Sequence, residues 1–135
     1  MTRAPAIDPS ERYVLLTTFR RDGSHVATPV WFAPLPDDPD TLAMITDREA
    51  GKVKRLRRTS RCTLAPCDVR GRPHGDAVEA EGRVADDPGE VAAATAALAA
   101  RYGWQWRLLG FGARLRGRDP AASRAVLLVR ATAPT

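Results

Sequence analysis

The sequence predicts a mainly β fold: a small antiparallel barrel of six strands with a few flanking helices. Six short segments are rich in strand-forming residues, and most of them follow one another through short connections, which favours antiparallel pairing. Strands do not alternate regularly with helices and no GxGxxG motif occurs, so a Rossmann-type cofactor domain is excluded.

The first two strands form a predicted hairpin. Residues 13–19 are apolar on both faces, and the Asp22-Gly23 pair after them is a strong two-residue turn signal. The return strand covers residues 25–33, in which Pro29 marks an edge or a bulge because it cannot donate to a ladder. A barrel of this size buries only its interior, so the other apolar face of the first strand needs a helix or a partner subunit.

The middle of the chain places a basic helix between two further strands. Residues 34–40, with three prolines and three aspartates, predict a loop before a third strand at residues 41–46. The helix begins at Lys52 in a ten-residue stretch with six cations, and a fourth strand follows at residues 62–69. A helix N-terminus carries partial positive charge and unpaired N–H groups, so this lysine indicates an anion site, with a solvated charged face as the alternative.

The last third of the chain contains the remaining elements. A turn at residues 70–73 precedes an alternating strand at residues 78–84. Asp87, followed by proline and a glutamate, is a good helix start for the alanine-rich segment that Gly103 stops. An irregular helix over residues 104–115 and a final strand over residues 124–130 complete the prediction.

Length and composition describe one soluble globular domain. The 135 residues contain 44% hydrophobic and 27% charged residues. We expect residues 1–10 to be a flexible N-terminus and residues 11–135 to form a single barrel domain. No apolar stretch is long enough to span a membrane and no signal peptide is evident, so the expected location is cytoplasmic. The net charge of +5 fits either nucleic acid or a polyanionic small molecule.

Few side chains of the sequence are suited to catalysis. Cys62 and Cys67 lie five positions apart on one strand, too far apart to bridge, and neither His25 nor His74 has a zinc-ligand spacing from them, so no metal site is expected. The serines lie outside any GxSxG motif, and both histidines are interpreted as ordinary surface residues. The catalytic residues therefore stay unknown, and a cofactor is expected to supply the chemistry.

Three segments in order resemble the pyridoxamine 5′-phosphate oxidase-like split β-barrel superfamily. They are the hairpin at residues 13–31, the basic segment at residues 51–61, in which Lys52 precedes Arg61 by nine positions, and residues 64–72. The residues of these three segments are most similar to those of the actinobacterial branch that uses the deazaflavin coenzyme F-420 instead of FMN. The resemblance covers roughly residues 11–130.

The resemblance implies a homodimer of six-stranded FMN-binding-type split barrels, with cofactor sites in grooves at the interface. Lys52 matches the phosphate-binding lysine, and Thr46 matches a hydroxyl at the end of the preceding strand. Many members place a second basic or hydroxyl residue directly before the lysine, where this chain has Ala50 and Gly51. Arg55, one turn after Lys52 on the same helix face, is a candidate replacement. The backbone lying along the cofactor ring is matched by Thr28, Pro29, Val30 and Trp31.

Further candidates surround this implied site. The deazaflavin carries a phosphodiester and an oligoglutamate tail, which a basic rim would complement. The candidates for that rim are Arg57, Arg58, Arg61, Arg114, Arg116 and Arg118. Trp104 and Trp106 are candidates to line a pocket for a planar substrate, although packing between helix and barrel explains them equally well.

The resemblance implies an F-420-dependent oxidoreductase that transfers hydride from the reduced deazaflavin to an unidentified electron-poor organic substrate. The alternatives are an FMN-binding oxidoreductase of the same fold, a non-catalytic deazaflavin-binding protein and a basic nucleic-acid-binding domain. The last is disfavoured because aromatic residues do not interleave with cations on a predicted strand face.

Overall fold

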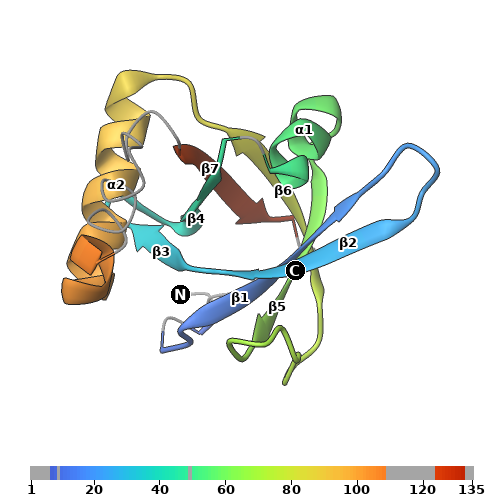
Figure 1. Cartoon of the computed structure of the whole chain (residues 1–135), viewed down its shortest axis with the longest axis horizontal. Helices are drawn as coiled ribbons and strands as arrows, with labels where there is room; N and C mark the ends of the chain where they lie inside the picture. Colours follow the sequence, from blue (N-terminus) through green and yellow to red (C-terminus); the bar gives the residue numbers. More distant parts are fainter. Residues whose placement is uncertain (1–6, 9, 49, 109–123, 133–135) are drawn as a thin grey trace, which may run out of the picture.

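The computed structural model describes residues 7–8, 10–48, 50–108 and 124–132. Within them, seven strands form one sheet in the order β2-β1-β5-β6-β7-β4-β3, and every neighbouring pair is antiparallel (Figure 1). The strands are β1 (Tyr13–Phe19), β2 (His25–Val30), β3 (Phe32–Leu35), β4 (Asp38–Asp47), β5 (Arg61–Cys67), β6 (Val78–Val84) and β7 (Arg124–Ala131). The helices are α1 (Gly51–Arg58) and α2 (Pro88–Tyr102).

The two edge strands of this sheet are one continuous length of chain. Only Trp31 separates β2 from β3, although β2 pairs with β1 at one edge and β3 pairs with β4 at the other. Val30 lies opposite Val14 in the first ladder, and Phe32 lies opposite Met44 in the second. The segment therefore curls the sheet into a barrel. The predicted barrel fold is confirmed, with seven strands instead of six because the predicted strand at residues 25–33 is divided at Trp31.

The predicted loop at residues 34–40 was wrong over most of its length. Pro34 pairs with Leu42, β4 already begins at Asp38, and a tight turn joins β3 to β4. Pro34 is compatible with β3 because β3 is an edge strand, and a bulge after Pro34 absorbs the irregularity. Pro29 likewise lies on an edge strand, as predicted.

The helices form where the sequence indicated them. Helix α1 begins at Gly51 and buries Val53 and Leu56. In α2, the Asp87 carboxylate accepts a hydrogen bond of 3.0 Å from the Glu90 N–H, and Gly103 ends the helix with φ at +55°. Residues 104–108 are helical, whereas the rest of the irregular helix predicted for residues 104–115 lies outside the described residues.

The two faces of the curled sheet support two clusters of buried residues. The barrel interior contains large side chains such as Phe32, Leu16 and Met44, and Ile7 is buried with them. The second cluster lies between the sheet and α2 and includes Leu98 and Tyr102. Figure 1 shows α2 beside β3 and β4, whereas α1 lies near β6 and the β1–β2 hairpin. In the described ranges, no helix is long and apolar enough to cross a membrane.

Strand β1 leaves one of its faces only partly covered. Its side chains alternate between buried and half-buried along the whole strand. Val14, Leu16 and Thr18 form the buried face, whereas Leu15 and Phe19 on the other face keep some exposure. Of the two apolar faces that the sequence predicted for this strand, therefore, only one is fully buried within one chain.

Candidate functional site

The start of α1 is open towards solvent. Its N-cap is Ala50, which has an extended backbone conformation and no side chain able to cap the helix. The first turn contains no acidic residue. Because the first N–H groups of a helix have no partner within the helix, an uncapped start is a favourable position for an anion.

Lys52 lies in this first turn and is half-buried. Burial lowers the pKa of its ammonium group, the charge of Arg55 lowers it further, and Asp47 acts in the opposite direction. In the part of the chain that the structure describes, Lys52 makes no hydrogen bond and no ion pair within 4.0 Å. A partly desolvated cation without a partner gains more from binding an anion than a fully hydrated one.

Arg55 is folded back over the helix start. Its Nε donates a hydrogen bond of 2.6 Å to the Oγ1 of Thr18, a residue of β1 that is only 1% exposed. A Cβ on Gly51 would lie 2.6 Å from the Arg55 Nη1, so the guanidinium occupies the space that any larger residue would fill. Burial and the charge of Arg20 lower the pKa of Arg55. Gly51 thus permits two cations, Lys52 and Arg55, to lie at one helix terminus.

The three arginines that follow in this region have partners within the chain. Arg57 lies 3.6 Å from Asp86, and the Arg58 Nη2 donates to the Phe19 carbonyl at 2.6 Å. Arg61 forms an ion pair of 3.2 Å with Glu79 and stacks on the Phe19 ring. The further rim candidates, Arg114, Arg116 and Arg118, lie outside the described residues.

The remaining predicted site residues lie on β4 and β2. Thr46 is half-buried near the end of β4, opposite Ala125. Thr28, Pro29 and Val30 lie on the edge strand β2, and the Trp31 ring stacks on Tyr102 with centroids 4.3 Å apart. Among the described residues, no hydrogen bond or ion pair joins Lys52 or Arg55 to these positions.

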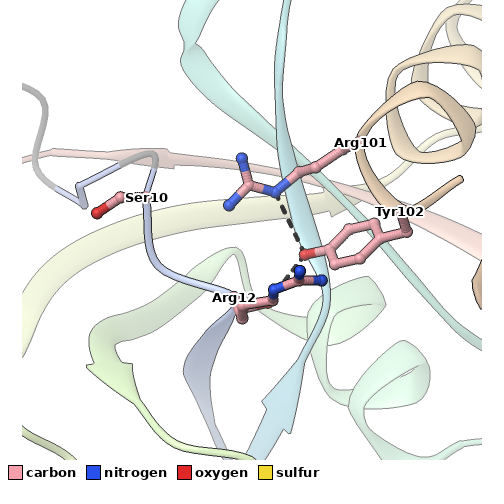
Figure 2. A pocket seen from close by; sticks show the side chains of 4 residues that line it. All are labelled: Ser10, Arg12, Arg101 and Tyr102. Atoms are coloured by element: carbon pink, nitrogen blue, oxygen red, sulfur yellow. Dashed lines mark hydrogen bonds between the residues drawn. The ribbon is translucent and has the colours of Figure 1, made fainter.

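Two features of the structure were not predicted from the sequence. Thr18 holds Arg55, and its position as a polar residue on the buried face of β1 was a usable signal. The second feature is a pocket of about 220 Å³ lined by Ser10, Arg12, Arg101 and Tyr102 (Figure 2). Its residues come from segments about 90 positions apart, so no local pattern indicates it.

Trp104 and Trp106 differ in their surroundings. Trp104 is 68% exposed, whereas Trp106 packs against the cluster beneath α2 and stacks with the guanidinium of Arg124 at 4.8 Å. Neither residue lines the pocket of Figure 2. Packing therefore accounts for Trp106, and Trp104 is a surface residue of this chain.

Comparison with known proteins identifies the family. The sequence profile described as pyridoxamine 5′-phosphate oxidase matches residues 5–133, nearly the whole chain. No curated protein sequence matches this chain.

Solved structures share the fold at low sequence identity. An F-420 reductase is 24% identical, with a TM-score of 0.57 over 93% of this chain and 90% of that one. A pyridoxamine 5′-phosphate oxidase-related FMN-binding protein from Nostoc punctiforme is 16% identical, with a TM-score of 0.57 over 89% and 71% of the two chains. A heme storage protein from Vibrio cholerae is 10% identical, with a TM-score of 0.64 over 93% and 84%.

Such distant structures establish the architecture of the chain and leave its chemistry open, because one fold supports several functions. The family follows instead from the profile match along almost the whole sequence. With its curled antiparallel sheet and flanking helices, this chain belongs to the pyridoxamine 5′-phosphate oxidase family.

Proposed function

We propose that this protein is an F-420-dependent oxidoreductase that holds the deazaflavin phosphodiester at the start of α1. One observation carries the proposal: the half-buried ammonium group of Lys52 makes no hydrogen bond and no ion pair within 4.0 Å with a described residue, and it lies at an uncapped helix terminus. The Arg55 guanidinium, folded over Gly51, adds a second charge there. These residues fit a phosphate group, because they combine two cations with unpaired backbone N–H groups.

The other proposed contacts position the ring of the cofactor. Strand β2 is an edge strand, so the backbone groups on its outer side have no ladder partner in the described sheet. Those groups, from Thr28 to Trp31, lie along the ring in this proposal, and the Thr46 hydroxyl contributes from the end of β4. Pro29 offers no N–H, which leaves the neighbouring backbone groups to make the contacts.

Bound, reduced F-420 supplies the chemistry of the reaction, a hydride delivered from C5 to an electron-poor substrate. The protein's contribution is to fix the ring beside the substrate and to exclude water from it. No side chain of the described residues is assigned as an acid, base or nucleophile. The catalytic residues and the substrate therefore remain outside the proposal.

The oligoglutamate tail is proposed to meet the exposed arginines that follow Lys52. Arg57 and Arg61 form ion pairs whose side chains are exposed, and such pairs contribute only about 0–1 kcal/mol. They can therefore exchange their present partners for a glutamate of the tail at little cost. We expect the tail to add less affinity than the phosphodiester.

Homodimerisation is part of the same proposal. The half-buried face of β1 carries Tyr13, Leu15 and Phe19, which keep some exposure within this chain. A second copy packed on this face would bury it and place a cofactor groove between the two chains.

FMN binding by the same residues is the second candidate. The likeness to an FMN-binding protein supports it, and so do the internal partners of Arg57, Arg58 and Arg61, because FMN has no anionic tail that requires a basic rim. A non-catalytic deazaflavin-binding protein is the third candidate, favoured only by the lack of an assigned catalytic group. The basic nucleic-acid-binding domain remains the least supported alternative.

The decisive experiment compares cofactors and two lysine variants. Titration of the protein with F-420 and with FMN, followed by tryptophan fluorescence, gives the preferred cofactor. Lys52→Ala removes a charge-assisted phosphate contact and is expected to weaken binding about ten- to a hundredfold. Lys54→Ala is the matched control, because Lys54 is exposed and lies about 200° around the helix from Lys52.

Equal cofactor affinity in both lysine variants would refute the site at the start of α1. Tighter binding of FMN than of F-420, with no effect of tail length, would transfer the proposal to FMN. Turnover of the reduced deazaflavin with an electron acceptor then separates an enzyme from a protein that only binds the cofactor.

A further inference from the structure

Two arginines meet at a small pocket that shares no residue with the proposed cofactor site. Arg12 precedes β1 and Arg101 lies in the last turn of α2. Figure 2 shows both side chains beside the Tyr102 hydroxyl, and Ser10 is the fourth described residue that lines the pocket. The pocket has a volume of about 220 Å³.

Among the described residues, every hydrogen-bond partner of these two arginines is neutral. The Arg12 Nη1 donates to the Oε1 of Gln105 at 3.0 Å. The Arg101 Nη2 donates to the Glu11 carbonyl, and its Nε donates to the Tyr102 hydroxyl at 3.4 Å. Within residues 7–8, 10–48, 50–108 and 124–132, neither arginine forms an ion pair.

Arg12 and Arg101 share this lack of a carboxylate partner with Arg55 and Arg58, but only Arg12 and Arg101 lie together at the pocket of Figure 2. Arg61 and Arg83 are each paired with a glutamate. Of the acidic side chains near the pocket, Glu11 has another partner, because its carboxylate lies 2.8 Å from the His74 Nε2. Asp8 accepts a hydrogen bond of 2.9 Å from the Ser10 N–H. Two guanidinium groups that form no ion pair with a described residue therefore lie at one cavity.

The surrounding contacts hold the arginines in place. The Arg101 guanidinium stacks 4.7 Å from the centre of the buried Phe32 ring, which restricts its orientation. Tyr102 is already occupied, because its hydroxyl lies 3.0 Å from the Phe32 nitrogen and within hydrogen-bonding distance of two carbonyl oxygens. The tyrosine thus positions the pocket, and the guanidinium N–H groups that remain face a ligand.

We propose that this pocket binds the oxyanion group, carboxylate or phosphate, of a small molecule. Arg12 and Arg101 supply planar forks that match such groups, and the Ser10 hydroxyl is an additional donor. Pockets for drug-sized ligands measure about 300–1,000 Å³, so a cavity of about 220 Å³ suits the anionic end of a smaller molecule. The proposal does not depend on which cofactor, if any, binds at α1.

The test titrates the full chain with simple anions at constant ionic strength, with chloride replaced by inorganic phosphate or by acetate. Binding is measured by calorimetry and by shifts of the backbone amide signals of residues 101–105 and of the Arg101 Nε–H signal. We expect saturable binding with a dissociation constant of about 1 mM or tighter for one of the two anions. Preference for phosphate or for acetate identifies the oxyanion class, and either supports the proposal.

Variants locate the binding. Arg12→Gln removes an exposed side chain and is expected to weaken binding about tenfold or more without unfolding the protein, as circular dichroism will verify. Arg101→Lys keeps the charge but loses the fork, and it is expected to weaken binding as well. Arg83→Gln is the matched control, because Arg83 already has Glu90 as a partner, and it should leave binding unchanged.

Three results would overturn the proposal. The first is the same affinity in Arg12→Gln as in the unmodified protein. The second is non-saturating binding that chloride abolishes in proportion to its concentration, and the third is loss of binding in Lys52→Ala. Lys52→Ala should retain anion binding at this pocket. Loss of binding in Lys52→Ala would instead assign the anion to the start of α1, whereas failure of F-420 and FMN to bind would leave the Arg12–Arg101 result unaffected.

Discussion

At the scale of single residues, the Tyr102 hydroxyl connects α2 to backbone groups 70 and 90 positions away in the sequence. It lies 3.0 Å from the Phe32 nitrogen and carbonyl oxygen and 2.9 Å from the Arg12 carbonyl. Phe32 is the first residue of β3, directly after the Trp31 link between the two edge strands, and its N–H donates to the Tyr102 hydroxyl. A side chain of α2 therefore satisfies the backbone at the point where the barrel closes.

Tyr102→Phe is expected to destabilise the protein by about 1–3 kcal/mol. The substitution leaves the buried N–H of Phe32 without an acceptor, while the stacked ring beside Trp31 is kept. Urea unfolding measures the loss. Tyr13→Phe is the control, because the Tyr13 hydroxyl makes no hydrogen bond with a described residue, and its unfolding free energy should stay within about 0.5 kcal/mol of the unmodified protein. Equal losses in the two variants would contradict this role of Tyr102.

The Cys62 thiol gives a second prediction at this scale. Burial, with a smaller effect of the charges of Glu79 and Glu81, raises the pKa of Cys62 from 9.0 to about 12. The unfolded chain therefore loses this proton first as the pH rises. The thiol's contribution to stability is complete below pH 9.0 and is lost as the pH rises towards about 12.

When the pH is raised from about 8 to about 10.5, we expect ionisation of Cys62 in the unfolded chain to lower the unfolding free energy by about 1–2 kcal/mol. Urea unfolding at both pH values, with Cys62→Ala as the comparison, isolates this effect from other groups that titrate in alkali. The variant should lose less stability over the interval than the unmodified protein. An identical pH dependence in both proteins would show that the thiol is not the cause.

At the scale of elements, α1 and α2 are fixed by different means. Helix α1 has no side-chain cap and packs by Leu56, whose Cδ1 lies 3.4 Å from the position of a Cβ on Gly82. The absence of a side chain at this position of β6 lets the helix approach the sheet closely. Helix α2 in contrast begins with a complete cap at Asp87 and Pro88.

Asp87→Ala is expected to destabilise the protein by about 0.5–2 kcal/mol, because the Glu90 N–H loses its acceptor at the helix start. The neighbouring Asp86→Ala is the control. Asp86 only forms an exposed pair with Arg57 at 3.6 Å, which contributes about 0–1 kcal/mol. Thermal and urea unfolding of both variants give the difference. A larger effect for Asp86→Ala would refute the capping role of Asp87.

Local patterns were sufficient for the elements that follow simple rules. The alternation at residues 78–84 and the continuous apolar run at residues 13–19 gave the bounds of β6 and β1, and the cap and stop residues gave α2. Residues 34–40 were misinterpreted because proline and aspartate usually mark loops, whereas here they form an irregular edge hairpin. Pairing of β3 with β4 determined the structure there, and that contact is not visible in local composition.

The candidate site was predictable to a similar extent. The helix start with Lys52 and Arg55 followed from charge and spacing. The contact between Arg55 and Thr18 joins residues 37 positions apart. The pocket brings Arg12, which precedes β1, together with Arg101 in the last turn of α2. Such contacts depend on how the elements pack, so they required the structure.

At the scale of the whole molecule, the half-covered face of β1 leads to the dimer prediction. Sedimentation at micromolar concentration is expected to give twice the protomer mass of 14.7 kDa. Leu15→Glu, on the half-buried face, is expected to shift the equilibrium towards monomer, because a buried charge without a partner opposes association. Thr41→Glu, on β4 away from this face, is the control. A protein that is monomeric without substitution would refute the interface and the shared cofactor groove.

The single-residue link at Trp31 gives the barrel an unusual sensitivity to chain length. Side chains in a strand alternate with a period of two, so a slip of one residue moves every side chain to the opposite face. Since β2 and β3 are both attached to Trp31, a deletion there cannot be absorbed in a loop and would misalign at least one of the two ladders. The turn between β1 and β2 around Gly23, by contrast, is exposed and can lengthen without shifting either ladder. We therefore expect related sequences to contain insertions at the tip of the β1–β2 hairpin and none at the Trp31 link.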